Sequence, residues 1–200
     1  MSGVAGVLLA AGAGSRFGGG GPPKVLHLFH GRPLLTWPLA ALRGGGLAHV
    51  VVVLGARADE VAAGVALGDA QVVCCDDWAD GVSASLRAGV RVAAARGADA
   101  VVVALADQPL LDARAVARLI AARSPSHLDA LRATYAGVPG HPTLLESSTF
   151  EAIEDLHGDA GARALLTFPA ARVGLVACDG LGHPDDADTP AALTRLEALA

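Results

Sequence analysis

The fold is decided by the stretch Leu8-Leu9-Ala10-Ala11-Gly12-Ala13-Gly14-Ser15-Arg16-Phe17-Gly18. It continues an apolar run that begins at Val4, and this run predicts the buried first strand of an α/β sheet. The glycines after the strand let the backbone turn its N–H groups toward an anion at close range. The stretch therefore predicts a phosphate-binding loop at the carboxyl end of the first strand.

Two cationic side chains accompany this loop. Arg16 offers a planar, forked donor, and Lys24, which follows the glycines, offers a compact point charge. Lys24 is the only lysine in a chain with 14 arginines. Its position at the exit of the loop is either an accident of composition or a phosphate contact, and we predict the contact.

The loop differs from two other phosphate-binding loops. It is not a Walker A loop, because no Gly-Lys pair is followed by Ser or Thr. The spacing Gly-x-Gly-x-x-x-Gly is one residue longer than the dinucleotide-binding fingerprint. The next strand, residues 50–54, ends without an acidic residue that could hold a ribose hydroxyl. These departures argue against NAD(P) binding.

Length and composition limit the classes of protein to which this chain can belong. With 200 residues, 52% hydrophobic and 4% aromatic, the chain fits a single α/β domain over residues 1–200 with a core of Ala, Val and Leu. A net charge of −5 and scattered arginines argue against nucleic-acid and membrane-surface proteins. The N-terminus has no secretory signal pattern and no membrane-spanning run, so we predict a cytoplasmic protein.

The cysteines and histidines do not predict a metal site. Cys74, Cys75 and Cys178 lie in apolar runs without zinc-ligand spacing, and we predict buried free thiols. The seven histidines form no HExxH or similar cluster.

Strand-like and helix-like patterns alternate along the chain. Strands are predicted at residues 4–9, 50–54, 71–74, 100–105, 128–134 and 172–177, and helices at residues 34–42, 58–65, 82–95, 113–122, 150–156 and 160–166. The alternation predicts a doubly wound, mostly parallel sheet in a three-layer αβα arrangement. Residues 135–142 are too rich in turn formers for regular structure and are predicted to form a lid or a substrate wall.

Two acidic positions are candidate ligands of a divalent cation. Asp107 follows the apolar run 101–106, and a carboxylate at a strand tip opposite a phosphate loop suits Mg²⁺, although a turn cap would look the same. Asp186 and Asp188 alternate onto one side of an extended segment, while Asp188-Thr189-Pro190 also fits a helix start. Because the chain has no asparagine, this acidic cluster is where a second oxygen ligand is expected.

Two further segments are candidate ligand surfaces. Residues 77–85 join a strand to a helix and place Ser83 and Ser85 where a helix N-terminus could meet an anion, as an ordinary helix cap also would. His141 lies between Gly140 and Pro142 in a rigid loop, where it is a structural side chain, a ligand contact or a catalytic base.

Taken in order, these segments resemble the molybdenum cofactor cytidylyltransferase family, within the wider MobA-like group of nucleotidyltransferases. The resemblance covers nearly the whole chain and rests on an ordered set of motifs. They are Leu9-Ala10-Ala11-Gly12 with Arg16, Gly18 and Lys24; residues 78–85; Asp107-Gln108-Pro109; Pro139-Gly140-His141-Pro142; Gly158-Asp159-Ala160-Gly161-Ala162-Arg163; and Asp186-Ala187-Asp188-Thr189-Pro190.

The resemblance implies a Rossmann-like nucleotidyltransferase whose first loop holds the nucleotide. Arg16, Lys24 and Asp107 are then catalytic, and Asp107 and Asp188 bind Mg²⁺. The implied nucleotide contacts are Leu9, Ala10, Ala11, Gly12, Gly14, Ser15, Arg16, Lys24 and Ser83. The implied acceptor contacts are Trp78, Gly140 and His141.

The resemblance also implies a reaction. Ala11 points to CTP, because cytidylyltransferases of this group tend to read Leu-Ala-Ala-Gly where guanylyltransferases read Leu-Ala-Gly-Gly. The phosphate of a molybdopterin-type acceptor would attack the α-phosphorus of CTP and release pyrophosphate, without a general base. A molybdoenzyme or its chaperone is a further candidate partner. The alternatives are a transferase that uses GTP or another phosphorylated acceptor, and a nucleotide-binding regulator or cofactor carrier without turnover.

Overall fold

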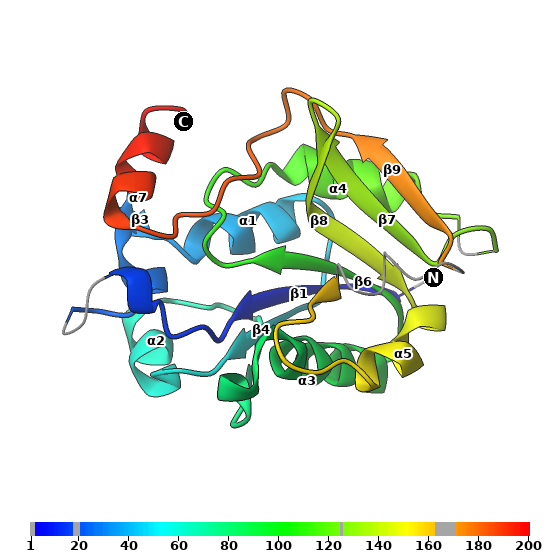
Figure 1. Cartoon of the computed structure of the whole chain (residues 1–200), viewed down its shortest axis with the longest axis horizontal. Coiled ribbons are helices and arrows are strands. Elements are labelled where there is room, and N and C mark those ends of the chain that lie inside the picture. The colour runs from blue at the N-terminus through cyan, green and yellow to red at the C-terminus, as the bar shows by residue number, and fades with distance from the viewer. Residues whose placement is uncertain (1–2, 18–20, 125, 163–170) are drawn as a thin grey trace.

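The apolar run before the glycine-rich loop forms strand β1 (Gly3–Ala10), which pairs with a parallel strand on each edge. The computed structural model describes residues 3–17, 21–124, 126–162 and 171–200, and seven of its strands form one sheet in the order β5-β4-β1-β6-β8-β7-β9 (Figure 1). Neighbouring strands are parallel except β8, which is antiparallel to β6 and β7. The other strands are β4 (Val50–Leu54), β5 (Gln71–Cys74), β6 (Ala98–Leu105), β7 (Ala130–Tyr135), β8 (Val138–Glu146) and β9 (Val173–Ala177).

Helices cover both faces of this sheet, so the predicted doubly wound, three-layer αβα arrangement is confirmed (Figure 1). Leu42 and Leu119 belong to the core on one face, and Leu86 and Ile153 belong to the core on the other. The helices are α1 (Thr36–Gly44), α2 (Ala58–Gly64), α3 (Val82–Ala95), α4 (Ala113–Ala121), α5 (Phe150–Glu154) and α7 (Pro190–Glu197).

Helix α3 approaches the sheet closely at Gly89. A Cβ atom built at Gly89 would lie 2.5 Å from Val7 Cγ1 and 2.9 Å from Val53 Cγ2. The flanking helix residues Leu86 and Val90 are buried against the same face. This part of the core therefore requires a residue without a side chain at position 89.

A third and smaller core lies beside the glycine-rich loop. Its buried members come from the loop, from the hairpin of β2 (Leu28–Phe29) and β3 (Arg32–Pro33), and from α7. They are Phe17, Phe29, Leu34, Ala187, Leu193 and Leu196. The C-terminal helix is thereby packed onto the loop that follows β1.

Residues 135–142 were predicted to be irregular, and this prediction is wrong. β7 ends at Tyr135 and β8 begins at Val138, so the segment forms a hairpin. Ala136 and Gly137 adopt φ values of 49° and 77°, the left-handed values that two-residue hairpin turns require. β8 then continues between β6 and β7, so these residues belong to the sheet and form no lid.

The remaining predicted elements start and end within two residues of those observed. The predicted helix at residues 160–166 lies outside the described residues from residue 163 onward, as do Gly18 and Arg163. Cys75 and Cys178 are buried free thiols as predicted, but Cys74 is exposed, because β5 is an edge strand whose side chains alternate between the sheet and solvent. No helix in the described ranges is long and apolar enough to cross a membrane.

Replacing Gly89 with valine should lower the free energy of unfolding by about 1 to 3 kcal/mol, because the new side chain overpacks the contact with Val7 and Val53. Urea denaturation measures the loss. The matched control is Ala94→Val on the exposed side of the same helix, with an expected change of about 0.5 kcal/mol. A Gly89→Val variant as stable as the wild type, or more stable, would mean that the core accommodates the side chain, because helix propensity alone favours valine over glycine.

Candidate active site

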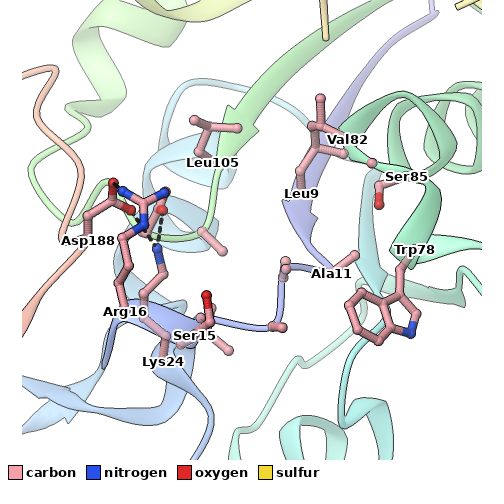
Figure 2. Close-up of a pocket in the computed structure, with 18 of the residues that line it drawn as sticks. Leu9, Ala11, Ser15, Arg16, Lys24, Trp78, Val82, Ser85, Leu105 and Asp188 are labelled. Atoms are coloured by element: carbon pink, nitrogen blue, oxygen red, sulfur yellow. Dashed lines mark hydrogen bonds and ion pairs between the residues drawn. The ribbon is translucent and has the colours of Figure 1, made fainter. Parts of the chain in front are cut away.

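The carboxyl ends of β1 and β6 open into a cleft of about 500 Å³. Figure 2 shows Arg16, Lys24 and Asp188 gathered at one end and Trp78, Val82 and Ser85 at the other. The predicted site residues that line the cleft are Leu9, Ala10, Ala11, Gly12, Gly14, Ser15, Arg16, Lys24, Trp78, Asp107 and Asp188. The glycine-rich loop and the tip of β6 therefore lie at the same edge of the sheet, as expected for groups that follow the carboxyl ends of neighbouring parallel strands.

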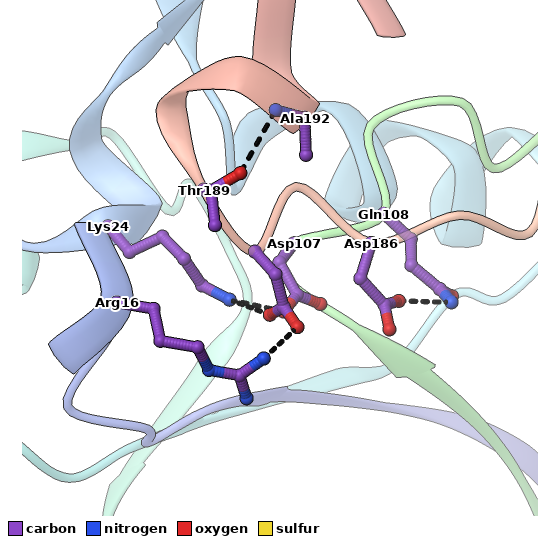
Figure 3. Close-up of polar contacts among 8 residues, drawn as sticks. Arg16, Lys24, Asp107, Gln108, Asp186, Thr189 and Ala192 are labelled. Carbon is purple, nitrogen blue, oxygen red and sulfur yellow. Dashed lines mark hydrogen bonds and ion pairs between the residues drawn. The ribbon is translucent and has the colours of Figure 1, made fainter. Parts of the chain in front are cut away.

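At the charged end, the Lys24 ammonium bridges two carboxylates (Figure 3). Lys24 Nζ lies 2.5 Å from Asp107 Oδ2 and 3.1 Å from Asp188 Oδ1, and Arg16 Nη1 lies 2.6 Å from Asp188 Oδ2. The Lys24 side chain is only 14% exposed. Burial disfavours its charge, but the two carboxylates outweigh burial and raise the pKa of the ammonium. Lys24 is therefore a charged member of the site.

The loop after β1 positions both cations. Ser15–Phe17 form a 3-10 turn in which Phe17 is buried in the third core, while Arg16 beside it reaches Asp188. Gly14 has a φ of +62°, and a Cβ atom there would lie 2.7 Å from Lys24 Cβ. Gly14 is thus required by its backbone conformation and by the close approach of Lys24.

The two carboxylates belong to segments that are hydrogen-bonded to each other. The Ala187 N–H donates to the Asp107 backbone carbonyl at 2.8 Å. Gln108 Nε2 donates to the Pro184 carbonyl at 2.8 Å and to Asp186 Oδ1 at 2.7 Å (Figure 3). Gln108, which is buried, therefore holds the acidic segment beside the tip of β6. Gln108 belongs to the Asp107-Gln108-Pro109 motif, but no local sequence pattern indicates this role for its side chain.

The sequence left open whether Asp188-Thr189-Pro190 starts a helix or supplies a carboxylate to the site. In the structure, Asp188 and Thr189 each take one of these two roles. Thr189 caps α7, because its Oγ1 accepts a hydrogen bond from the Ala192 N–H at 3.1 Å. Asp188 instead pairs with Lys24 and Arg16. The residue that caps the helix and the carboxylate that is ion-paired in the cleft are therefore neighbours in one motif.

At the other end of the cleft, Trp78 and Ala11 converge over Gly55. A Cβ atom at Gly55 would lie 2.5 Å from Trp78 Cβ and 2.7 Å from Ala11 Cβ. Ser85 lines this end, whereas Ser83 is fully buried and lies outside the cleft. The predicted nucleotide contact at Ser83 is therefore not among the residues that line the cleft, because positions three apart, Val82 and Ser85, share the helix face that meets it.

Gly140 and His141 do not lie among the described residues that line the cleft. Gly140 packs against Pro184 and the Tyr135 ring. His141 Nδ1 lies 3.4 Å from the Val103 carbonyl oxygen, and desolvation lowers the pKa of the imidazole. The structural interpretation of His141 is supported, and direct acceptor contacts from these two residues are not. Asp159, from the next motif, lines the cleft instead.

The sequence matches the MobA-like NTP transferase domain over residues 6–174. The chain belongs to this family. It is 36% identical to nicotine blue oxidoreductase of Paenarthrobacter nicotinovorans over 199 residues, which cover 96% of each chain. It is 34% identical over 160 residues to the bifunctional protein GlmU of Mycolicibacterium gilvum, a match that covers 76% of this chain and 32% of GlmU.

Solved structures confirm the Rossmann-like nucleotidyltransferase fold of this MobA-like domain. Rv0371c from Mycobacterium tuberculosis H37Rv has a TM-score of 0.83 and 30% identity, with 98% of both chains covered. A structure of Rv0371c in complex with manganese has a TM-score of 0.82, again at 30% identity, with 100% of both chains covered.

The charged end of this MobA-like cleft has the donors that a hard divalent cation prefers. Asp107 and Asp188 already converge on one cation, Lys24 Nζ, and Mg²⁺ commonly takes one or two carboxylates together with substrate phosphates. Partial burial and the Asp107 carboxylate raise the pKa of the neighbouring Asp186 to about 6. In the part of the chain that the structure describes, no three His, Cys, Asp or Glu side chains form a complete protein cage. The residues present therefore fit a cation shared with phosphates.

Thr189→Val should lower the free energy of unfolding by about 0.5 to 2 kcal/mol, because valine keeps the shape but cannot accept the Ala192 hydrogen bond. Its Mn²⁺ affinity, measured by calorimetry with a triphosphate present, should stay within about twofold of the wild type. Asp188→Asn is the companion variant and should weaken Mn²⁺ binding more than it weakens the fold. Equal loss of Mn²⁺ affinity in both variants would show that the helix start, rather than the carboxylate, forms the site.

Proposed function

We propose that this protein transfers a nucleotidyl group from a nucleoside triphosphate to a phosphate of a small acceptor and releases pyrophosphate. The observation that carries the proposal is the charged end of the cleft, where two cations and two carboxylates lie beside the glycine-rich loop. Membership of the MobA-like NTP transferase family supports it. We further propose that residues 1–200 act as one domain in the cytoplasm.

The two ends of the cleft differ in charge, and this difference would set the orientation of a bound nucleotide. The triphosphate would lie at the glycine-rich loop, where backbone N–H groups, Arg16 and Lys24 provide donors and positive charge. The base would then extend toward Trp78 and Ser85, which supply an aromatic surface and a hydroxyl. In this orientation Trp78, which the sequence predicts as an acceptor contact, would meet the nucleotide instead. We propose CTP as the donor because Ala11 narrows this end.

The chemistry forms one bond and breaks one bond. An oxygen of the acceptor phosphate attacks the α-phosphorus while the bond from that phosphorus to the bridging oxygen breaks, and pyrophosphate leaves. A phosphate oxygen is already a nucleophile at neutral pH, so alignment and charge neutralisation suffice. Arg16 and Lys24 would neutralise the charge that moves onto the leaving pyrophosphate.

A divalent cation, Mg²⁺ in this proposal, would be held by Asp107 and Asp188 and would neutralise phosphate charge when bound. Gln108 keeps the two carboxylate segments together through its bonds to Pro184 and Asp186. The acceptor that the motifs favour is a molybdopterin-type phosphate, with a molybdoenzyme or its chaperone as recipient of the product. The acceptor would enter the cleft on the side of Asp159.

A redox function is the second candidate, favoured by the name of the relative that is 36% identical over 96% of this chain. Two assays on one preparation separate the candidates. Pyrophosphate release from each nucleoside triphosphate with phosphorylated acceptors supports transfer. Metal-independent transfer of a hydride from a reduced nicotinamide dinucleotide to nicotine blue as the electron acceptor, without pyrophosphate release, would support the redox function. Tight triphosphate binding with neither activity would support a regulator or carrier.

Asp107→Asn should reduce pyrophosphate release by about 100-fold or more, because the amide keeps the shape but loses the charge at the metal site. Circular dichroism and urea unfolding establish that the variant is folded. The matched control is Asp69→Asn, which removes an exposed carboxylate paired with Arg43 and should leave turnover unchanged. Near-normal turnover by folded Asp107→Asn would remove Asp107 from the mechanism.

Calorimetry with Mg²⁺ should show tighter binding of CTP than of GTP, and Ala11→Gly should reduce that preference by about fivefold or more, because it removes a methyl group from the wall beside Trp78. Ala13→Gly makes the same replacement elsewhere in the loop and should keep the preference. A wild-type protein that binds GTP as tightly as CTP would be placed among guanylyltransferases instead.

A further inference from the structure

Lys24 occupies the position between two carboxylates that a divalent cation would need. Its Nζ donates to Asp107 at 2.5 Å and to Asp188 at 3.1 Å (Figure 3). A metal ion held by both carboxylates would approach the same groups. Because an ammonium and a metal ion repel each other at such distances, they compete for this place.

The charges of the four side chains that are ion-paired at this end of the cleft balance in the absence of any ligand. Asp107 and Asp188 carry two negative charges, and Lys24 and Arg16 carry two positive charges. The Lys24 and Asp107 side chains are 14% and 19% exposed, so solvent screens their pairing incompletely. A metal ion that binds without a triphosphate must break these ion pairs. A triphosphate instead brings negative charge with which Lys24 and Arg16 can pair in place of the carboxylates.

Lys24 is attached so that it can exchange partners. Its backbone belongs to the 3-10 turn Lys24–Leu26, which buried Val25 anchors, and Gly14 lies against its Cβ. The glycine-rich loop therefore lies beside the base of the side chain. The side chain has four carbons joined by rotatable bonds between the backbone and Nζ. The ammonium can therefore move from the carboxylates to a phosphate at the loop without backbone movement.

We propose that Lys24 keeps Asp107 and Asp188 closed to divalent cations until a triphosphate draws its ammonium away, an inference that rests on the nucleotidyl transfer proposed above. Without nucleotide, the carboxylates hold the ammonium. With nucleotide, the ammonium pairs with phosphate and the carboxylates are released for the metal. Metal and triphosphate then strengthen each other's binding by the same factor, as thermodynamic linkage requires.

The first test measures the affinity of the nucleotide-free protein for Mn²⁺ alone, from the electron paramagnetic resonance signal of free Mn²⁺. Lys24→Met should bind Mn²⁺ about tenfold more tightly than the wild type, because no ammonium has to be displaced. Arg16→Met removes the same charge from the same cluster but leaves the Lys24 bridge, and should change the affinity by about threefold or less. Arg91 lies on α3 and pairs with Glu154 of α5, so Arg91→Met controls for remote charge and should leave the affinity unchanged.

Equal gains in Lys24→Met and Arg16→Met would reduce the effect to local charge and overturn the proposal, as would an unchanged affinity in folded Lys24→Met. Lys24→Arg, which keeps a cation, should remain a weak Mn²⁺ binder and serves as a second variant if Lys24→Met does not fold.

The second test uses the wild-type chain, in which a ¹³Cε-lysine label reports on Lys24 alone. Mg²⁺ at saturation should shift this single resonance as the ammonium leaves the carboxylates, and a triphosphate without metal should also shift it. A resonance that both additions leave unmoved would overturn the proposal. Neither test involves turnover, so a protein that releases pyrophosphate but fails both tests refutes only the counterion role. A protein that passes both without turnover refutes only the proposed function.

Discussion

The ammonium of Lys24, held between carboxylates that lie 83 and 164 positions away in the chain, is the interaction on which the rest of the site depends. Each partner is placed by a different element. Lys24 follows the loop after β1, Asp107 follows β6, and Asp188 precedes α7. If one of these elements were displaced, a largely buried charge would lose its partner, at a considerable cost in free energy. The ion pairs of the site therefore form only when these three elements are packed in their places in the fold.

The C-terminal segment shows how that constraint is met. Residues 182–188 run beside the turn after β6, with a bridge between Leu111 and Gly182 and a hydrogen bond from the Ala187 N–H to the Asp107 carbonyl. Leu193 and Leu196 of α7 then pack with Phe17 in the third core. Hydrophobic burial thus fixes the distance between the loop that carries Arg16 and the segment that carries Asp188. The candidate cleft of this family member is therefore built from the segment that carries Asp188 as well as from the sheet.

Much of the fold could be predicted from the sequence, because continuous apolar runs such as Val50–Leu54 distinguish buried parallel strands from amphipathic helices. β8 could not, because Gly140 and its flanking prolines are typical of turns, and only pairing with β6 and β7 makes them a strand. The candidate site was predicted as a set of residues on one rim. Its internal contacts were not, since no local pattern reveals that Lys24 meets Asp107 or that Gln108 reaches Asp186. Whether Ser83 or Ser85 faces the cleft does not follow from the sequence, because the phase of a helix is uncertain until its neighbours are known.

The two ends of the cleft are constrained to different degrees, and this difference bears on how far a family name defines an activity. The charged end is built from strand tips, a glycine that cannot be replaced without strain, and a network of ion pairs, so it changes only if several elements change together. The end near Trp78 and Ser85 is a surface of single side chains, each of which can vary alone. Relatives with names as different as nicotine blue oxidoreductase and GlmU therefore need share only the first end. In this chain both carboxylates of the charged end pair with Lys24, and Asp188 also pairs with Arg16, which supports the proposed phosphate chemistry. If the charged end is shared in this way, the difference between one activity and another must lie at the end near Trp78 and Ser85.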